Sequence, residues 1–477
     1  MTIADPAPPP SPPAPHPAPP ETTRPAERNR KVQRIVILGG GFGGVYTALN
    51  LEKIFRRNEG VEITLISRDN YFLMTPFLFE AGSGVLEPRH AVSPIRMMFS
   101  RARFVDAEVE RIDFNARKVH ARHTPDNFEY DVEYDQLVIA LGGITNRSLI
   151  PGSEKAFGFK TLGDAIFLRN KIIDLLEQAD VEEDVDRRRK LLTLVIIGGG
   201  LVGVELMGEM TEFVHNLLRS YPRIPRELVR FVLIEAHNRI MPEMEESLAA
   251  YATDVLWKRG VSFLTGVRVK AIEEGKVVLP EGVEPATIDA ETIILTAGLT
   301  ANPLLEKLPL EKAKNGRVVV DGSMRTSSHH EVWALGDCAA IPDKNGNPYP
   351  PLAQHALREA RVLARNIAAV VRGGRDAKIE KFDYETMGML ASLGRFRGVG
   401  RVGSFKIRGF LAWWVWRSYY LLQMPRWERK IRVVLDWTIA LFFRNDVVKL
   451  DLFGETHPTR KSPCPPQTPV AGVQQVD

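Results

Sequence analysis

Two glycine-rich turns carry the clearest chemical signal in this sequence of 477 residues. Each matches G-x-G-x-x-G directly after an apolar run: Gly39, Gly41 and Gly44 follow residues 34–38, and Gly198, Gly200 and Gly203 follow residues 192–197. The first glycine allows a tight turn, the second lets the backbone approach a pyrophosphate, and the third lets the next helix pack closely on the strand. One match is a weak signal, but two in the same strand–turn–helix context predict two dinucleotide sites.

Acidic residues at strand ends refine this prediction. Glu235 ends the strand after the second turn, where a carboxylate accepts hydrogen bonds from a ribose 2′-hydroxyl and repels a 2′-phosphate. The second site is therefore expected to bind NADH rather than NADPH. Ser67 holds the corresponding position after the first turn and is a weaker ribose partner, so that contact stays open. Asp337, which follows Gly336, can orient the ribityl chain and pyrophosphate of a flavin, so the two sites predict a flavin and a nicotinamide in one chain.

The elements that must position these residues alternate between strand and helix. Strand-like apolar runs occupy residues 34–38, 61–66 and 137–140, the series repeats at 192–197, 231–235 and 292–297, and a further run follows at 332–335. This order is typical of parallel, doubly wound α/β sheets. We expect two Rossmann-like dinucleotide-binding domains, the second inserted in the first. Residues 31–160 and 300–378 would bind the flavin, and residues 161–299 would bind NADH.

Composition excludes several other classes of protein. Hydrophobic residues make up 44% and charged residues 26%, which is typical of a globular protein, and a net charge of +4 argues against a dedicated nucleic-acid binder. The two cysteines, Cys338 and Cys464, cannot form a disulfide framework, a C-x-x-C centre or a four-cysteine metal site. No metal is expected, Cys338 is expected to be a small buried packing residue, and redox chemistry is assigned to a bound cofactor. The proline-rich ends, 1–30 and 456–477, predict disordered tails.

Positive charge and tryptophan concentrate near the C-terminus. Residues 395–444 hold eleven Lys or Arg and two acids, a net +9 that leaves −5 for the rest of the chain, and five of the seven tryptophans. The apolar run 410–424 is too short to span a bilayer, which takes about 20 residues. Within a C-terminal domain of residues 379–455, residues 405–445 therefore predict an amphipathic helical anchor lying on an anionic membrane surface. The alternative is a helical hairpin that packs in the core or at a dimer interface, so a homodimer is kept as an alternative.

Over residues 33–450 the sequence resembles the type II NADH:quinone oxidoreductases, which are two-dinucleotide-domain flavoproteins. The matching stretches are 36–44, 70–78, 197–205, 297–298, 334–338 and 352–356. The resemblance implies FAD at the first turn, NADH at the second, and a quinone as acceptor. It implies a peripheral enzyme on the cytoplasmic face of the cell inner membrane. With no spanning segment, no path for proton pumping is expected.

Individual residues follow from this resemblance and from the strand ends. The residues expected at FAD, besides the first turn, are Ser67, Asn70, Thr75, Pro76, Ala140, Gly142, Gly336, Asp337 and Ala353. Glu235, Ala297 and Gly298 are expected at NADH, besides the second turn. Glu205 would lie near the stacked nicotinamide and flavin. Gln354 would lie where the flavin meets the quinone, because its amide can donate to a quinone carbonyl without carrying a charge.

Two departures from the family pattern concern the expected quinone pocket. Leu357 and Arg358 stand where a second glutamine is common, and Met387-Gly388 stands where Lys-Gly is common. They slightly favour an NADH-dependent flavin reductase with a non-quinone acceptor. A non-enzymatic flavoprotein that senses nicotinamide is a separate alternative.

Overall fold

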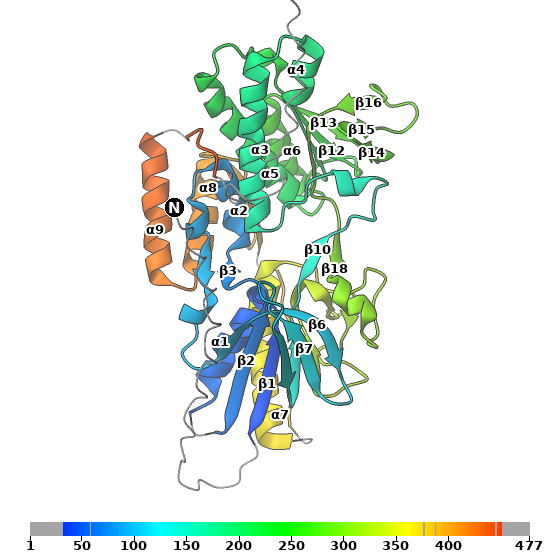
Figure 1. Ribbon diagram of the computed structural model, residues 1–477, viewed down its shortest axis with the longest axis vertical. Helices are drawn as coiled ribbons and strands as arrows, with labels where there is room; N and C mark the ends of the chain where they lie inside the picture. Colours follow the sequence, from blue (N-terminus) through cyan, green and yellow to red (C-terminus); the bar gives the residue numbers. More distant parts are fainter. Residues whose placement is uncertain (1–31, 58, 375–376, 387, 444–445, 451–477) are drawn as a thin grey trace, which may run out of the picture.

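The computed structural model describes residues 32–57, 59–374, 377–386, 388–443 and 446–450. The predicted tails and Met387 lie outside the described residues. Within the described part, the chain forms two sheet-based bodies, one above the other in Figure 1, with helices α8 and α9 beside them.

The first body is built on a five-stranded parallel sheet with strand order β20-β9-β1-β2-β5. Its strands are β1 (Gln33–Leu38), β2 (Val61–Ser67), β5 (Arg103–Asp106), β9 (Gln136–Ile139) and β20 (Val332–Ala334). Helices α1 (Phe42–Ile54) and α7 (Ala353–Gly373) pack against each other and cover this sheet. The strands β9 and β20 are fully buried and β1 is buried over its last four residues, as parallel strands covered on both faces should be, whereas the edge strand β5 and its neighbour β2 are only partly buried.

The second body is built on a four-stranded parallel sheet with strand order β13-β12-β11-β17. Its strands are β11 (Thr193–Ile197), β12 (Arg230–Glu235), β13 (Val261–Thr265) and β17 (Thr292–Leu295), and its helices are α3 (Leu162–Val181), α4 (Val185–Leu191), α5 (Leu201–Leu217) and α6 (Glu246–Trp257). The chain leaves this sheet after β17 and returns to the first sheet at β20. The second sheet is therefore an insertion, and the predicted α/β architecture of two dinucleotide sheets is confirmed.

Smaller antiparallel elements complete both bodies. The strands β10 (Gly143–Thr145) and β18 (Leu299–Ala301) pair where the chain crosses between the bodies. The first body carries β3 (Tyr71–Leu73) paired with β4 (Val92–Pro94), helix α2 (Leu78–Ser83), the sheet β6 (Glu108–Asp113), β7 (Lys118–Arg122) and β8 (Glu129–Glu133), and the pair β19 (Val318–Val319) and β21 (Ala339–Ala340). The second carries β14 (Ala271–Glu273), β15 (Lys276–Val278) and β16 (Thr287–Asp289).

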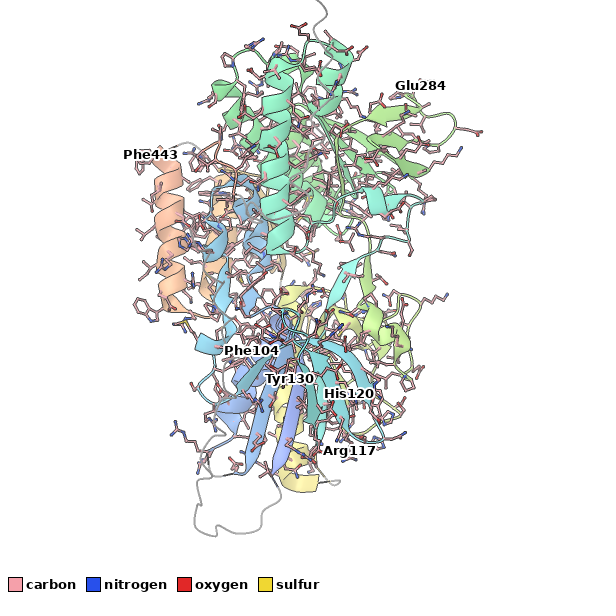
Figure 2. The ribbon with its side chains drawn as sticks, in the orientation of Figure 1. Phe104, Arg117, His120, Tyr130, Glu284 and Phe443 are labelled. Atoms are coloured by element: carbon pink, nitrogen blue, oxygen red, sulfur yellow. The ribbon has the colours of Figure 1, made fainter. Side chains whose placement is uncertain are left out.

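The C-terminal region adds an antiparallel sheet and two helices. The strands are β22 (Gly388–Ser392), β23 (Gly398–Val402) and β24 (Phe405–Arg408), and the helices are α8 (Phe410–Gln423) and α9 (Trp427–Phe442). Arg417 of α8 is buried against Glu80 of α2, with Arg417 Nε 2.9 Å from Glu80 Oε1. In the described part of the chain, no helix combines the length and the apolar character that crossing a bilayer requires. Helix α8 is therefore partly core, whereas α9 lies at the periphery (Figures 1 and 2).

Candidate active site

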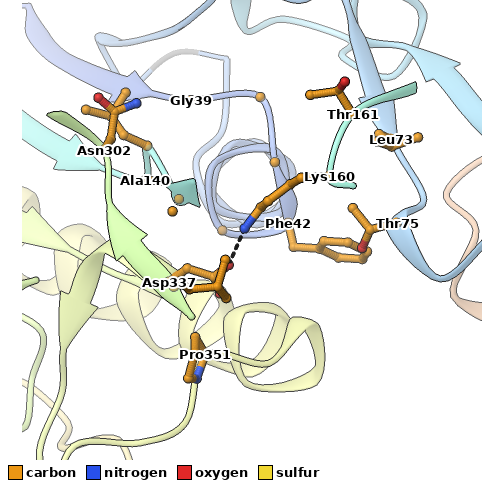
Figure 3. Close-up of a pocket in the computed structure, with 18 of the residues that line it drawn as sticks. Gly39, Phe42, Leu73, Thr75, Ala140, Lys160, Thr161, Asn302, Asp337 and Pro351 are labelled. Atoms are coloured by element: carbon orange, nitrogen blue, oxygen red, sulfur yellow. Dashed lines mark hydrogen bonds and ion pairs between the residues drawn. The ribbon is translucent and has the colours of Figure 1, made fainter. Parts of the chain in front are cut away.

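A cavity of about 1030 Å³ lies between the two sheet-based bodies and is lined by both. Its wall includes the first glycine turn, the end of β2, the first turn of α5, the loop after β20 and the start of α7. Figure 3 shows Gly39, Thr75, Ala140 and Asp337 around this space. Strand ends and helix starts thus converge on one hollow, as expected for ligand sites of open parallel α/β sheets.

The two glycine turns have the conformation that close approach to a phosphate needs. Gly39 has φ +110°, which side-chain-bearing residues rarely adopt, and a Cβ on Gly44 would lie only 1.9 Å from the Gly39 carbonyl oxygen. Gly198 and Gly203 repeat both features in the second turn. Helices α1 and α5 begin directly after these turns and have no side-chain cap, so their first N–H groups are left for an anionic ligand.

The structure brings twelve of the predicted site residues to the cavity wall. They are Gly39, Gly41, Ser67, Thr75, Pro76, Ala140, Gly142, Glu205, Gly298, Gly336, Asp337 and Ala353. The others do not line this cavity: Gly44, Gly198, Gly200, Gly203, Glu235, Ala297, Gln354 and Asn70. Asn70 lines a separate cavity on the first body.

Two charged residues at this site carried no recognisable sequence signal. Lys160 precedes α3 in the chain, yet its Nζ lies 3.2 Å from Asp337 Oδ2, as Figure 3 shows. The ammonium group offsets the negative charge that Asp337 would otherwise present to a pyrophosphate. Glu359 of α7 accepts a hydrogen bond from Gly336 N at 2.8 Å, and burial raises its pKa to about 7. Neither residue stands in a motif, so only the fold reveals them.

Glu205 lies on α5 at the cavity wall and is held by the C-terminal region. Its Oε1 accepts hydrogen bonds from Ser392 N and Trp416 Nε1, both at 2.9 Å. Burial raises its pKa to about 8, with smaller contributions from the nearby carboxylates Glu209 and Glu80. At neutral pH the carboxyl group is therefore mostly protonated, and with Oε1 accepting two hydrogen bonds, Oε2 is the oxygen left to carry the proton.

Glu235 is tied to the second glycine turn. Its Oε2 accepts a hydrogen bond from Gly199 N at 2.5 Å, and its Oε1 accepts one from His237 N at 2.8 Å. The carboxylate is thus fixed beside the turn where a bound adenosine ribose would lie. Oε1 also lies 2.6 Å from His237 Nδ1, so Oε2, with its single hydrogen bond, is the oxygen that keeps acceptor capacity for a ribose hydroxyl.

Gln354 is the second residue of α7, directly after Ala353, which lines the cavity, and it is oriented by the segment that follows α7. Its Nε2 donates to Gly388 O at 3.2 Å, and its Oε1 accepts from the hydroxyl of Tyr384 at 3.3 Å. The Arg358 guanidinium lies 4.3 Å above the Tyr384 ring. Arg358, where the family pattern commonly has a second glutamine, thus supports the residue that fixes Gln354.

Cys338 is fully buried behind this site. Its thiol donates to Leu335 O at 3.2 Å, and burial raises its pKa to about 11. An inaccessible, protonated thiol is a poor nucleophile, which agrees with the predicted packing role.

The cavity fits an extended flavin dinucleotide. The first turn can take the pyrophosphate, the Lys160–Asp337 pair lies beside it, and Thr75, Pro76 and Ala353 add a less polar wall. The start of α5 opens on the same space through Leu201, Val202 and Glu205, which would let a nicotinamide bound at the second turn reach the flavin ring. Tyr420 of α8 and Leu390 of β22 also line it, so the C-terminal region forms part of its wall.

Two protein-family models match the sequence. Residues 33–360 match the model of the pyridine nucleotide-disulphide oxidoreductases, and residues 387–446 match the NDH2 C-terminal domain.

Curated relatives match over most of their length. A probable NADH dehydrogenase of Dictyostelium discoideum is 30% identical, covering 87% of this chain and 91% of the relative. The type II NADH:quinone oxidoreductase Ndh of Mycobacterium tuberculosis is also 30% identical, covering 88% of this chain and 89% of the relative. Among solved structures, NDH2 from Plasmodium falciparum in complex with NADH has the same fold, with a TM-score of 0.81 at 20% identity, covering 88% of this chain and 100% of that one.

Proposed function

The chain belongs to the pyridine nucleotide-disulphide oxidoreductase family and, within it, to the type II NADH:quinone oxidoreductases, and on that basis we propose that it transfers two electrons from NADH through FAD to a quinone. The observation that carries the proposal is the single cavity where the first glycine turn, the start of α5 and the C-terminal region meet. An oxidoreductase of this kind needs all three, because donor, flavin and acceptor must share one space.

The first body would hold FAD through its glycine turn, Ser67, Thr75, Pro76, Ala140, Gly142, Gly336, Asp337 and Ala353. FAD bound there would supply the hydride-accepting and electron-delivering chemistry that no side chain provides. Lys160 holds Asp337 in place and lowers the negative charge near the pyrophosphate. Asn70 lines the separate cavity, so it would influence the flavin site only indirectly, through the neighbouring strand β3. Residues 31–160 and 300–378 remain our proposed limits for this domain.

The second body, with proposed limits 161–299, would hold NADH at Gly198, Gly200, Gly203, Ala297 and Gly298. Glu235 would accept a hydrogen bond from the adenosine ribose and would repel a 2′-phosphate. Because Glu205 lies on the first turns of α5, the nicotinamide would arrive beside its protonated carboxyl group. Glu205 can thus hold a proton at Oε2 close to where the reduced quinone must gain protons.

The quinone would approach from the side formed by the C-terminal region. Gln354 directly follows Ala353, which lines the cavity, and its amide is oriented by Tyr384 and Gly388. An amide can donate to a quinone carbonyl without the cost of burying a charge. Tyr420 and Leu390 supply an apolar wall on the same side.

Helix α9 supports a peripheral position on a membrane, with residues 405–445 as the proposed contact. The face that turns toward the protein is mixed: Asp436 Oδ2 lies 2.6 Å from His90 Nδ1, Arg429 donates to Arg89 O at 3.0 Å, and Val433 is fully buried. Other apolar side chains of the helix are left exposed, Leu435 and Ile439 at 55% each and Phe442 at 79%. Such a patch marks an interaction surface. We assign it to the cytoplasmic face of the membrane, and a homodimer would compete for the same face.

Steady-state oxidation of NADH by a short-chain quinone tests the proposal. The FAD-loaded full chain is expected to turn over with NADH and to use NADPH poorly. Gln354→Leu should lower kcat/KM for the quinone by about tenfold, the worth of one lost hydrogen bond of ~1.5 kcal/mol, and should spare flavin reduction by NADH. The control, Gln178→Leu, removes an exposed amide from α3 and should change neither step. Absence of quinone turnover in a protein whose flavin NADH reduces would refute the quinone assignment.

A further inference from the structure

A second cavity of about 510 Å³ lies between α9 and the segment that joins β3 to β4, on the first body. Four arginines line it: Arg89, Arg96, Arg429 and Arg432. No acidic residue lines it within the described part of the chain. Tyr71 lines both this cavity and the large one, so β3 forms the wall between them.

The positive charge of this pocket is only partly compensated by the protein. Arg89 pairs with Glu87 at 2.9 Å, and the remaining cation candidate, His90, pairs with Asp436. Arg96 lies over the Phe104 ring at 5.0 Å. Among the described residues, no carboxylate lies within salt-bridge distance of Arg96, Arg429 or Arg432. Three arginines therefore line this pocket without a carboxylate partner, Arg96 and Arg432 exposed and Arg429 half-buried, and an anion bound there would supply the missing counter-charge.

Arg429 is the least exposed of these arginines. Its Nε is buried and has no hydrogen-bond partner among the described residues, although its Nη1 donates to Arg89 O. Burial lowers its pKa below the usual value for arginine, and the positive charges of Arg432, Arg426 and Arg89 lower it further, against the opposing effect of Glu428. A buried donor of this kind costs free energy until an acceptor reaches it.

We propose that this arginine pocket binds the phosphate of an anionic glycerophospholipid headgroup. Arginine is suited to phosphate because its planar fork donates two parallel hydrogen bonds. The lipid source is favoured over free phosphate because Arg429 and Arg432 belong to α9, whose exposed side chains include Ile431, Leu435 and Ile439. A phosphate in the pocket would leave its acyl chains beside that apolar face. The inference rests on the proposed membrane association and deepens it, from diffuse attraction to one defined site.

The pocket is placed to bring lipid close to the redox cavity. Tyr71 contributes to both walls, and β3 runs from Tyr71 to Leu73, which also lines the large cavity. A headgroup held by the arginines would fix one edge of the flavin domain at the bilayer surface.

Vesicle co-sedimentation of the FAD-loaded full chain tests the site. Vesicles of phosphatidylcholine with one-fifth phosphatidylglycerol are compared with vesicles of phosphatidylcholine alone, at physiological salt. We expect Arg96→Gln with Arg432→Gln to lower partitioning onto the anionic vesicles by about tenfold or more. The matched control is Arg57→Gln with Arg372→Gln, which removes the same charge outside residues 405–445 and also includes one arginine lying over an aromatic ring, Arg372 over Phe55. We expect the control to lose less than about threefold. Equal losses in the two variants would show diffuse attraction and overturn the proposal.

A second measurement needs no variant and separates the two phosphate sources. Dihexanoyl phosphatidylglycerol below its micellar concentration should raise the Tm of the wild-type holoenzyme, and dihexanoyl phosphatidylcholine should raise it much less. The same Tm rise with inorganic phosphate at equal concentration would overturn the lipid assignment. Turnover of NADH with a water-soluble quinone, measured without vesicles, should be unchanged in Arg96→Gln with Arg432→Gln. Failure of quinone turnover with lipid binding intact would refute the proposed function alone, and the reverse would refute the lipid site alone.

Discussion

At the scale of single residues, Glu205 shows how burial sets chemistry in this cavity. Its carboxyl group is desolvated, and its pKa of about 8 exceeds the value near 4.5 that it has when exposed. The folded protein therefore keeps a proton that the unfolded chain releases as pH rises from about 4.5 to about 8, so this residue lowers stability across that window.

Replacing this acid should reverse that effect. In Glu205→Gln, Oε1 can still accept from Ser392 N and Trp416 Nε1, and no proton is lost on unfolding. We expect the free energy of unfolding of the variant relative to wild type to increase steadily between pH 5 and pH 8, by at most roughly 1.4 kcal/mol per pH unit, and the Tm difference to increase with it. Thermal melts of the holoenzyme at three pH values measure this, with the exposed Glu273→Gln as control. A Tm difference that is constant with pH would contradict the buried-proton account.

Glu235 sets the expected preference between the two nicotinamide cofactors. Its carboxylate lies at the second glycine turn, bonded to Gly199 N and to His237 N. In Glu235→Gln the repulsion of a 2′-phosphate disappears while the side-chain volume stays. We expect the ratio of kcat/KM for NADH to that for NADPH to fall about tenfold, equivalent to ~1.4 kcal/mol. Glu273→Gln carries the same charge change far from the turn and should keep the ratio. An unchanged ratio in Glu235→Gln would show that Glu235 does not determine the preference for NADH over NADPH.

These residues differ in how far the sequence could identify them. Glu235 could be predicted because it ends a strand at a fixed spacing from a glycine motif. Lys160, Glu359 and Tyr384 could not, because each reaches the site through tertiary packing and none stands in a motif. Asn70 lies inside a recognisable stretch, yet its neighbour Tyr71 lines the large cavity and Asn70 does not. Sequence spacing identifies a segment, but not which of two adjacent residues faces the ligand.

At the scale of elements, α8 is fixed to the body by a buried ion pair. Arg417 lies between the rings of Trp413 and Trp437, at 4.2 and 4.6 Å, and its Nη2 lies 2.8 Å from Glu80 Oε1. Arg417→Met keeps the apolar bulk but leaves Glu80 buried without its cation, which should cost about 3–5 kcal/mol. We expect a large fall in Tm. Arg365→Met, which removes an exposed pair with Glu380, should cost less than ~1 kcal/mol. Similar Tm values for the two variants would contradict the anchoring role.

Helix α9 should carry the membrane contact. Leu435→Glu with Ile439→Glu places two charges on its exposed apolar face, so we expect binding to phosphatidylcholine vesicles to be lost. Flavin reduction by NADH should remain, because neither residue lines the cavity. Val181→Glu with Val185→Glu alters two side chains exposed at 68% and 55% on the second body and is the matched control. Equal vesicle binding by both variants would show that this face of α9 is not the membrane anchor. The face would then be assigned to another partner, such as a second copy of the chain.

The strands and the C-terminal helices also differ in how predictable they were. The runs 34–38 and 192–197 lie within one residue of β1 and β11, because buried parallel strands are uninterrupted apolar segments. The environment of the apolar run 410–424 was harder to predict. Trp413 and Trp416 of α8 are buried in the protein, whereas Trp414 is exposed. Hydrophobicity alone does not distinguish a face that packs on protein from one that packs on lipid, so the predicted anchor was partly core.

At the scale of the whole molecule, the large cavity exists only because the chain folds back on itself. The second sheet is inserted between β9 and β20 of the first, and this brings α5 opposite the first glycine turn. The C-terminal region then closes the third side and holds Glu205 through Ser392 and Trp416. The first glycine turn, the start of α5 and the C-terminal region are therefore parts of one arrangement. The proposed transfer from a water-soluble donor to a lipid-soluble acceptor requires such an arrangement.

Reoxidation of the reduced flavin tests this account most directly. The FAD-loaded full chain is reduced anaerobically with one equivalent of NADH and mixed rapidly with a short-chain quinone, while flavin absorbance is followed. We predict complete reoxidation of the flavin, with one quinol formed per flavin and a rate at least equal to kcat. Flavin that NADH reduces quickly but that stays reduced in the presence of excess quinone would contradict it.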